Sequence, residues 1–111
     1  MKKIEAVVLA SREKNILDAL QRLGIGGLTV TPGKGRGKGP RDVQPGLGRY
    51  IERYNDVLTF FIVVEDSKVD KVVSAITEAS HTGNLGDGKI FISTIDDVID
   101  ITTKQKGEAY I

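Results

Sequence analysis

The chain has 111 residues, a formal net charge of +1 and no cysteine, so we expect one domain over residues 1–111 without disulfides or thiolate sites. A charge this close to zero argues against a generally basic protein that coats nucleic acid. The longest apolar runs fall far short of the ~20 residues that a membrane span needs, and no apolar signal-peptide core follows Met1, so we expect a cytoplasmic protein that is not inserted in a membrane.

The first third of the chain predicts a strand, a helix and a second strand. Residues 4–9 are rich in β-forming side chains, and Ser11 can cap a following helix that has Glu13 in its first turn. Gly24 supplies the stop signal of that helix. The second strand is expected over residues 28–31. The apolar positions of the helix recur at helical spacing: Ile16, Leu17, Leu20 and Leu23.

The later part of the chain repeats this order. Residues 57–64 predict a third strand, whose nearly continuous apolar end suggests burial on both faces. Ser67 can cap a second helix, a fourth strand follows over residues 90–95, and a short fifth is expected over residues 98–101. Two βαβ units predict an α+β, ferredoxin-like split βαβ (βαββαβ) sandwich with a long loop between strands 2 and 3. The second helix carries its apolar face on Val69, Val72, Val73 and Ile76.

A long insertion, from about residue 32 to 55, separates the two units. Residues 32–49 hold all three prolines and six of the thirteen glycines, and such a stretch cannot bury enough apolar surface to order itself. Within it, Gly35-Arg36-Gly37-Lys38-Gly39 suits a phosphate-binding turn, an RNA-contacting segment or a flexible linker. An RNA reader would need aromatic stacking platforms, and none precedes Tyr50 in this segment.

A second glycine-rich stretch, TGNLGDGKIFI, covers residues 82–92. Asp87-Gly88 before an apolar run indicates a turn, because glycine adopts a positive φ without strain. Successive backbone N–H groups in such a turn can also form a nest for an anion, and Lys89 would add a positive charge. The local pattern leaves a plain turn and an anion site both open.

Other polar residues have structural interpretations. His81, the only histidine, is expected to cap the second helix instead of acting as a ligand or base. Asp96, Asp97 and Asp100 suit turns better than a metal cluster, because successive strand residues point to opposite faces. No Ser/His/Asp arrangement or H-E-x-x-H spacing occurs, so the sequence gives no support for an enzyme.

The stretch TGNLGDGKIFI and the start MKKIEAVVLASREKNILDALQRLGIGGLTVT resemble the PII signal-transduction (P-II nitrogen regulatory) proteins, and the likeness weakens only in residues 32–49 and after Val98. The resemblance implies a divergent PII-like homotrimer that binds an adenine nucleotide in clefts between subunits. It also implies that residues 32–55 are the T-loop, a mobile arm that reaches a membrane transporter or a metabolic enzyme. The nucleotide contacts that it implies are Thr29, Gly35, Arg36, Gly37, Lys38, Val63, Gly86, Asp87, Gly88 and Lys89.

The chain departs from the PII pattern where phosphate and metal are held. Members that sense 2-oxoglutarate carry Gly-aromatic-Gly-Arg-Gln-Lys-Gly, whereas GRGKGPR here lacks the glutamine whose oxygen helps hold Mg²⁺. Asp100 and Thr102 stand at the family's Arg-x-Arg pair, and Phe61 stands where a glutamate often contacts the ribose. We therefore expect ADP or AMP to bind at least as tightly as ATP, with no requirement for Mg²⁺ and no response to 2-oxoglutarate.

Several alternatives stay open at this point. Tyr50 aligns with a tyrosine that some PII proteins have uridylylated, although its flanking residues suit packing or a partner contact better. A ferredoxin-like nucleic-acid-binding domain could use the basic residues of the insertion, although we expect no nucleic-acid partner. A PII-like protein could also sense inorganic carbon or metal transport instead of nitrogen. A slow nucleotide hydrolase lacks a candidate base or nucleophile.

Overall fold

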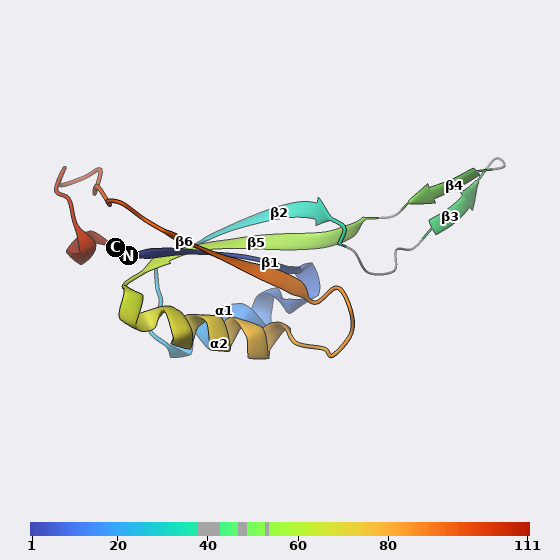
Figure 1. The fold of residues 1–111 in the computed structure, drawn as a ribbon, viewed down its shortest axis with the longest axis horizontal. Coiled ribbons are helices and arrows are strands. Elements are labelled where there is room, and N and C mark those ends of the chain that lie inside the picture. Colours follow the sequence, from blue (N-terminus) through green and yellow to red (C-terminus); the bar gives the residue numbers. More distant parts are fainter. Residues whose placement is uncertain (38–42, 47–48, 53) are drawn as a thin grey trace.

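The computed structural model describes residues 1–37, 43–46, 49–52 and 54–111. One antiparallel sheet has the strand order β2-β5-β1-β6, and two helices cover one of its faces (Figure 1). The order β-α-β-β-α-β confirms the predicted ferredoxin-like α+β fold. The elements of this sandwich are β1 (Lys2–Leu9), α1 (Glu13–Arg22), β2 (Thr29–Gly35), β5 (Asn55–Val64), α2 (Val69–Ser80) and β6 (Gly88–Thr94).

Each helix begins behind a short 3₁₀ turn, η1 (Ala10–Arg12) before α1 and η2 (Asp66–Lys68) before α2. The predicted side-chain caps are wrong, because Ser11 and Ser67 lie inside these turns and neither helix has a side-chain cap. The 3₁₀ turns supply backbone bonds at the helix start, so no serine oxygen is needed there. The C-terminal stop of α1 is confirmed, since Gly24 has a φ of +76° and its N–H donates to the carbonyl of Gln21.

The hydrophobic core lies between the helices and the sheet face that they cover. The predicted apolar faces of both helices point into it, except that Leu23 at the end of α1 is 39% exposed. Fully burying one such aliphatic side chain contributes about 1.5–3 kcal/mol. The core consists of Ile4, Ala6, Val8, Ile16, Leu20, Leu58, Phe60, Ile62, Val64, Val72 and Ile76.

The other face of the sheet has no described helix over it (Figure 1). The expectation that the third predicted strand is buried on both faces is therefore wrong for the single chain, because burial alternates along β5. Phe60 is 0% exposed beneath the helices, and Phe61 is 42% exposed on the uncovered face. The two phenylalanines do not share a face, because adjacent strand residues point to opposite faces.

The long connection between the second and third sheet strands, residues 32–55, is called the arm below. It is partly β structure, because β2 continues to Gly35, which pairs with Asn55 at the start of β5. Pro32 is tolerated there because β2 is an edge strand. Farther out, β3 (Val43–Gly46) and β4 (Arg49–Glu52) pair as an antiparallel hairpin beyond the end of the main sheet (Figure 1). The sequence pattern did not reveal this hairpin.

The predicted fifth strand over residues 98–101 is wrong. The described residues show only an isolated bridge between Ile99 and Lys106, and a 3₁₀ turn, η3 (Glu108–Tyr110), follows. Aspartate side chains compete with strand pairing here, since Asp97 accepts the N–H of Val98 and Asp100 accepts that of Thr103. The bond from Thr103 holds the pKa of the Asp100 carboxyl below its ordinary value. The turn-forming role expected of these two aspartates is confirmed.

No helix in residues 1–37 or 54–111 is long and apolar enough to cross a membrane. Within the same ranges and the hairpin, no group of three or more His, Cys, Asp or Glu side chains could hold a metal ion.

Candidate functional site

A cleft of about 360 Å³ opens at the end of the sheet from which the arm leaves. The pairs Leu9↔Val57 and Val8↔Gly88 bring the end of β1 together with the starts of β5 and β6. Six of the residues predicted to bind a ligand line this cleft, although they come from two distant stretches of sequence. They are Gly35, Arg36 and Gly37 at the base of the arm, and Gly86, Gly88 and Lys89 at the start of β6.

Gly88 is required at its position by the backbone itself. Its φ is +129°, and a Cβ there would lie 2.2 Å from the carbonyl oxygen of Val7. No side chain fits at that separation, so β6 can enter the sheet beside β1 only with glycine here. Gly86 also has a positive φ, +95°, but a Cβ there would meet nothing within 4 Å. The two glycines therefore differ: one is fixed by conformation and close packing, the other by conformation alone.

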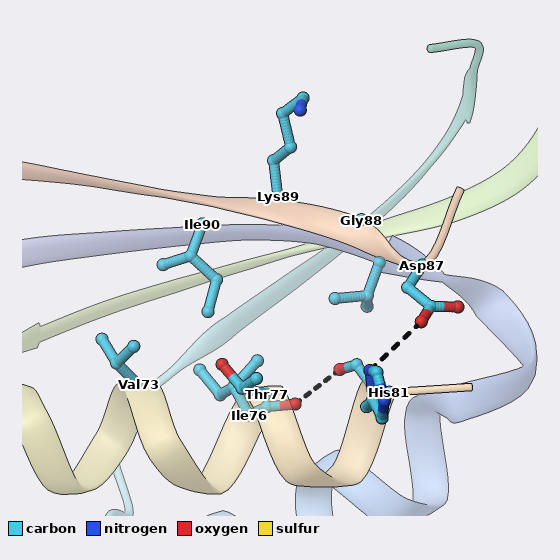
Figure 2. Close-up of a pocket in the computed structure, with 10 residues that line it drawn as sticks. Val73, Ile76, Thr77, His81, Asp87, Gly88, Lys89 and Ile90 are labelled. Atoms are coloured by element: carbon cyan, nitrogen blue, oxygen red, sulfur yellow. Dashed lines mark hydrogen bonds and ion pairs between the residues drawn. The ribbon is translucent and has the colours of Figure 1, made fainter. Parts of the chain in front are cut away.

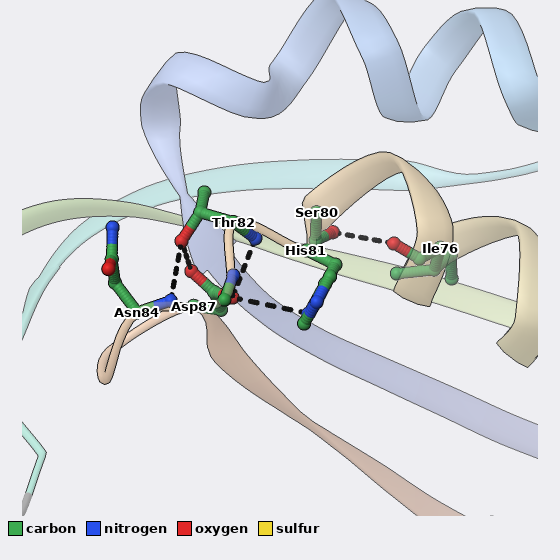
Figure 3. Close-up of polar contacts among 7 residues, drawn as sticks. Ile76, Ser80, His81, Thr82, Asn84 and Asp87 are labelled. Carbon is green, nitrogen blue, oxygen red and sulfur yellow. Dashed lines mark hydrogen bonds and ion pairs between the residues drawn. The ribbon is translucent and has the colours of Figure 1, made fainter.

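Asp87 ties together the turn that precedes β6 (Figure 3). Its Oδ2 accepts the backbone N–H groups of Thr82 at 2.7 Å and Gly83 at 3.2 Å, and the Thr82 hydroxyl donates to Oδ1. These hydrogen bonds, above all that from the Thr82 hydroxyl, hold the pKa of the Asp87 carboxyl below its ordinary value. Asp87 thus has a structural role in the turn, and its predicted contact with a ligand stays a prediction.

His81 ends α2, as expected, because its backbone N–H donates to the carbonyl of Thr77. Its Nδ1 also lies 3.6 Å from Oδ2 of Asp87, so the end of the helix contacts the turn (Figure 3). A protonated imidazole would strengthen this contact, and the imidazole is largely exposed to solvent.

A second cavity, of about 400 Å³, lies between α2 and the start of β6 and was missed by the sequence analysis. Val73, Ile76 and Ile90 give it apolar walls, and His81 and Asp87 lie among its lining residues (Figure 2). Ile90 points toward α2 whereas Lys89 points to the opposite side of the strand (Figure 2). The alternation of side chains along β6 therefore directs the Lys89 ammonium away from this cavity.

Two predicted contacts lie at the other end of the sheet. Thr29 pairs with Phe61, and Val63 pairs with Lys3. Six strand steps separate Thr29 from Gly35, which is about 20 Å along β2. Within one chain, these two residues are not brought to the cleft.

Two further predictions fall outside the part of the chain that the structure describes. Lys38 lies outside the described residues. The backbone of Tyr50 is part of β4, and its side chain lies outside the described part of the structure.

The base of the arm carries an aromatic contact that the sequence analysis did not find. The guanidinium carbon of Arg36 lies 5.6 Å from the centroid of the Tyr54 ring. Lys34 pairs with Asp56 in the β2–β5 ladder, one step inward from Gly35 and Asn55. Nζ of Lys34 lies 3.8 Å from Oδ1 of Asp56. The arrangement places cationic side chains, Arg36 and Lys89, on the cleft from opposite segments. Such a site suits an anionic ligand.

The chain is similar to known proteins over nearly its whole length. The family model of nitrogen regulatory protein P-II matches residues 1–105. The chain is similar to the nitrogen regulatory protein P-II of Azospirillum brasilense, with 39% identity over 109 residues and 96% of each chain covered. The protein of the same name from Pyropia yezoensis is 44% identical over 105 residues, with 93% of each chain covered. That from Microchaete diplosiphon is 42% identical over 108 residues, with 96% of each chain covered.

Proposed function

Because the chain belongs to the P-II nitrogen regulatory family, whose members are signal-transduction regulators and not enzymes, we propose that it binds an adenine nucleotide in the cleft at the base of its arm. Binding there regulates a membrane transporter or a metabolic enzyme through the arm. The observation that carries this proposal is the meeting of two distant glycine-rich segments, at Gly35–Gly37 and Gly86–Lys89, on one cleft.

The cleft offers the groups that phosphates need. Backbone N–H groups of glycine-rich turns can approach an anion closely, and Lys89 and Arg36 supply charge from the two sides. Each phosphate beyond the first adds charge that must be met by donors or cations. Asp100, which stands at a cationic position of the family pattern, is an acceptor within its own turn. We infer that ADP or AMP binds at least as tightly as ATP, without a requirement for Mg²⁺.

A homotrimer would complete the site. Thr29 and Val63 lie about 20 Å from the cleft within their own chain, so they reach a bound nucleotide only from a neighbouring subunit. Contacts between opposite ends of successive subunits are heterologous, and such contacts generate a closed ring when the rotation between subunits closes, as in a trimer. The uncovered sheet face, with Phe61 and Phe91 exposed by 42% and 56%, is the apolar surface that this assembly would bury.

The position of the cleft links a bound nucleotide to the arm. β2 leaves the sheet at Gly35, and the next residues, Arg36 and Gly37, line the cleft. A nucleotide that contacts these residues acts where the arm leaves the fold. It changes what the arm presents to a partner only if its affinity differs between arm conformations.

Calorimetric titration with AMP, ADP and ATP, each with and without Mg²⁺ and 2-oxoglutarate, tests the proposal. We expect Lys89→Ala to weaken binding by about 1–3 kcal/mol, as for one charged hydrogen bond. Lys71→Ala, on the exposed surface of α2, is the matched control and should bind as the original chain does. Failure to bind any adenine nucleotide would overturn the proposal. ATP binding that is tightened by Mg²⁺ and 2-oxoglutarate would overturn only the expected preference.

A further inference from the structure

Tyr54 and Arg36 face each other where the arm joins the sheet. The last pair of the β2–β5 ladder is Gly35↔Asn55, so Arg36 and Tyr54 are the next residues outward on the two segments. The guanidinium carbon lies 5.6 Å from the ring centroid, within the range of a cation–π contact. The Tyr54 side chain is half-exposed, so the contact lies at the surface of the fold and not in its core.

The two residues differ in their relation to the cleft. Arg36 lines the cleft, and Tyr54 does not. A long arginine side chain on a surface has many rotamers, and a ring against its flat face removes some of that freedom. We propose that Tyr54 is a positioning residue for nucleotide binding: its ring holds the Arg36 guanidinium at the mouth of the cleft, where the guanidinium meets a phosphate group.

Stacking and phosphate binding are compatible at one guanidinium. A ring can pack on the flat face of a guanidinium while a phosphate is bound by the N–H groups along the edge. Lys89 approaches the same cleft from β6 and would meet the phosphates from the other segment. The inference rests on the nucleotide binding proposed above, and it assigns Tyr54 to the phosphate end of the ligand and not to the adenosine.

This role predicts a pattern that a merely structural tyrosine would not give. Tyr54→Leu should weaken ADP binding about 2–5-fold, the range of an exposed cation–π contact, and should leave adenosine binding unchanged. Tyr54→Phe keeps the ring and should bind as the original chain does. Tyr110→Leu is the matched control, because this tyrosine is 37% exposed and is not among the residues that line the cleft.

A double-mutant cycle with Arg36→Ala and a ligand-free measurement make the test decisive. Once Arg36 is removed, Tyr54→Leu should cause no further loss of ADP affinity. In the free protein, the Nε–H proton resonance of Arg36 should carry a ring-current shift that Tyr54→Leu abolishes and Tyr54→Phe keeps.

Equal ADP affinity for the original chain and Tyr54→Leu would overturn the inference and leave the proposed function intact. An undiminished effect of Tyr54→Leu in the Arg36→Ala background would also overturn it, because Tyr54 would then act by another route. A chain that binds neither ADP nor AMP would overturn the proposed function and this inference together. The expected result is a 2–5-fold loss that depends on Arg36, with the ring-current shift lost in parallel.

Discussion

The two faces of the sheet carry neighbouring residues of the same strands in opposite environments. Phe60 is 0% exposed beneath α1 and α2, whereas Phe61 is 42% exposed on the face that the described helices leave uncovered. Both residues belong to one apolar run, so composition does not distinguish them. This chain's own helices bury one face, whereas the other face is suited to contact with a further molecule.

The uncovered face mixes apolar and charged side chains. Glu5 lies between Phe61 and Phe91 in the register of β1 with its two neighbours. Nζ of Lys3 lies 2.8 Å from Oε1 of Glu5 and 5.8 Å from the centroid of the Phe61 ring. On an exposed surface, ion pairs of this kind keep their charges solvated. Where a second copy of the chain covers the surface, they can orient that copy.

Replacing a phenylalanine on each face tests the difference between the covered and the uncovered face. Phe60→Ala should lower the free energy of unfolding by about 3–5 kcal/mol, because it leaves a cavity beneath the helices. Phe61→Ala should cost less than about 1 kcal/mol when the chain is monomeric. Urea denaturation of both variants, at a concentration where sedimentation shows monomers, measures the difference. Equal losses would show that the two faces are not distinct in the single chain.

Gly88 lines both cavities, and its substitution tests how closely β6 packs against β1. Gly88→Ala should destabilise the fold by about 2–4 kcal/mol, since its Cβ would lie 2.2 Å from the Val7 carbonyl oxygen at a φ of +129°. Gly86→Ala is the matched control, because it shares the positive φ but has open space, and it should cost about 1–2 kcal/mol. Thermal unfolding of both variants separates close packing from backbone strain. A Gly88→Ala variant as stable as Gly86→Ala would contradict the packing argument.

Sequence patterns predicted the covered face better than the uncovered one. Helical spacing placed Ile16, Val72 and Ile76 correctly, because the helices bury one stripe in their own chain. It could not separate Phe60 from Phe61, since a continuous apolar run contains no alternation to read. The residue pattern before each helix also predicted side-chain caps at Ser11 and Ser67. Backbone hydrogen bonds of the 3₁₀ turns occupy these helix starts instead.

The candidate site divides in the same way. The glycine-rich segments were predicted to share a ligand through their likeness to a family, and the structure brings Gly35 and Gly88 onto one cleft. Tyr54 was missed because its contact with Arg36 joins residues on either side of the arm, and no local pattern reports such a pair. Long-range pairing in the sheet, and not local propensity, creates that contact.

A charge on the uncovered face should break the proposed assembly without unfolding the chain. Phe91→Glu would bury a second carboxylate beside Glu5 between subunits, which is costly, whereas a single chain can solvate it. We expect the sedimenting mass to fall from that of a trimer to that of a monomer, with an unchanged far-ultraviolet circular dichroism spectrum. Leu23→Glu is the matched control, because Leu23 is 39% exposed at the end of α1. A trimer that persists in Phe91→Glu would contradict a subunit contact at this face.

The smallest expected effect concerns the turn before β6 that Asp87 holds together. The pKa of Asp87 lies below its ordinary value of 3.8, first because of the Thr82 hydroxyl and then because of backbone N–H groups. A lowered pKa in the folded state means that the carboxylate stabilises the turn fully above pH 3.8 and loses this effect as the pH falls through the lowered pKa.

Thr82→Val removes the leading cause and should move the pKa of Asp87 back toward 3.8, so that the turn opens at a higher pH. His81→Ala should shift it less, because the imidazole makes the weakest contribution, across 3.6 Å to Oδ2. Titration of the carboxyl carbon by NMR measures both changes. Asp66, whose lowered pKa comes from the N-terminal amine, is the internal control and should not move. An Asp87 pKa that is unchanged in Thr82→Val would show that its backbone bonds alone hold the turn.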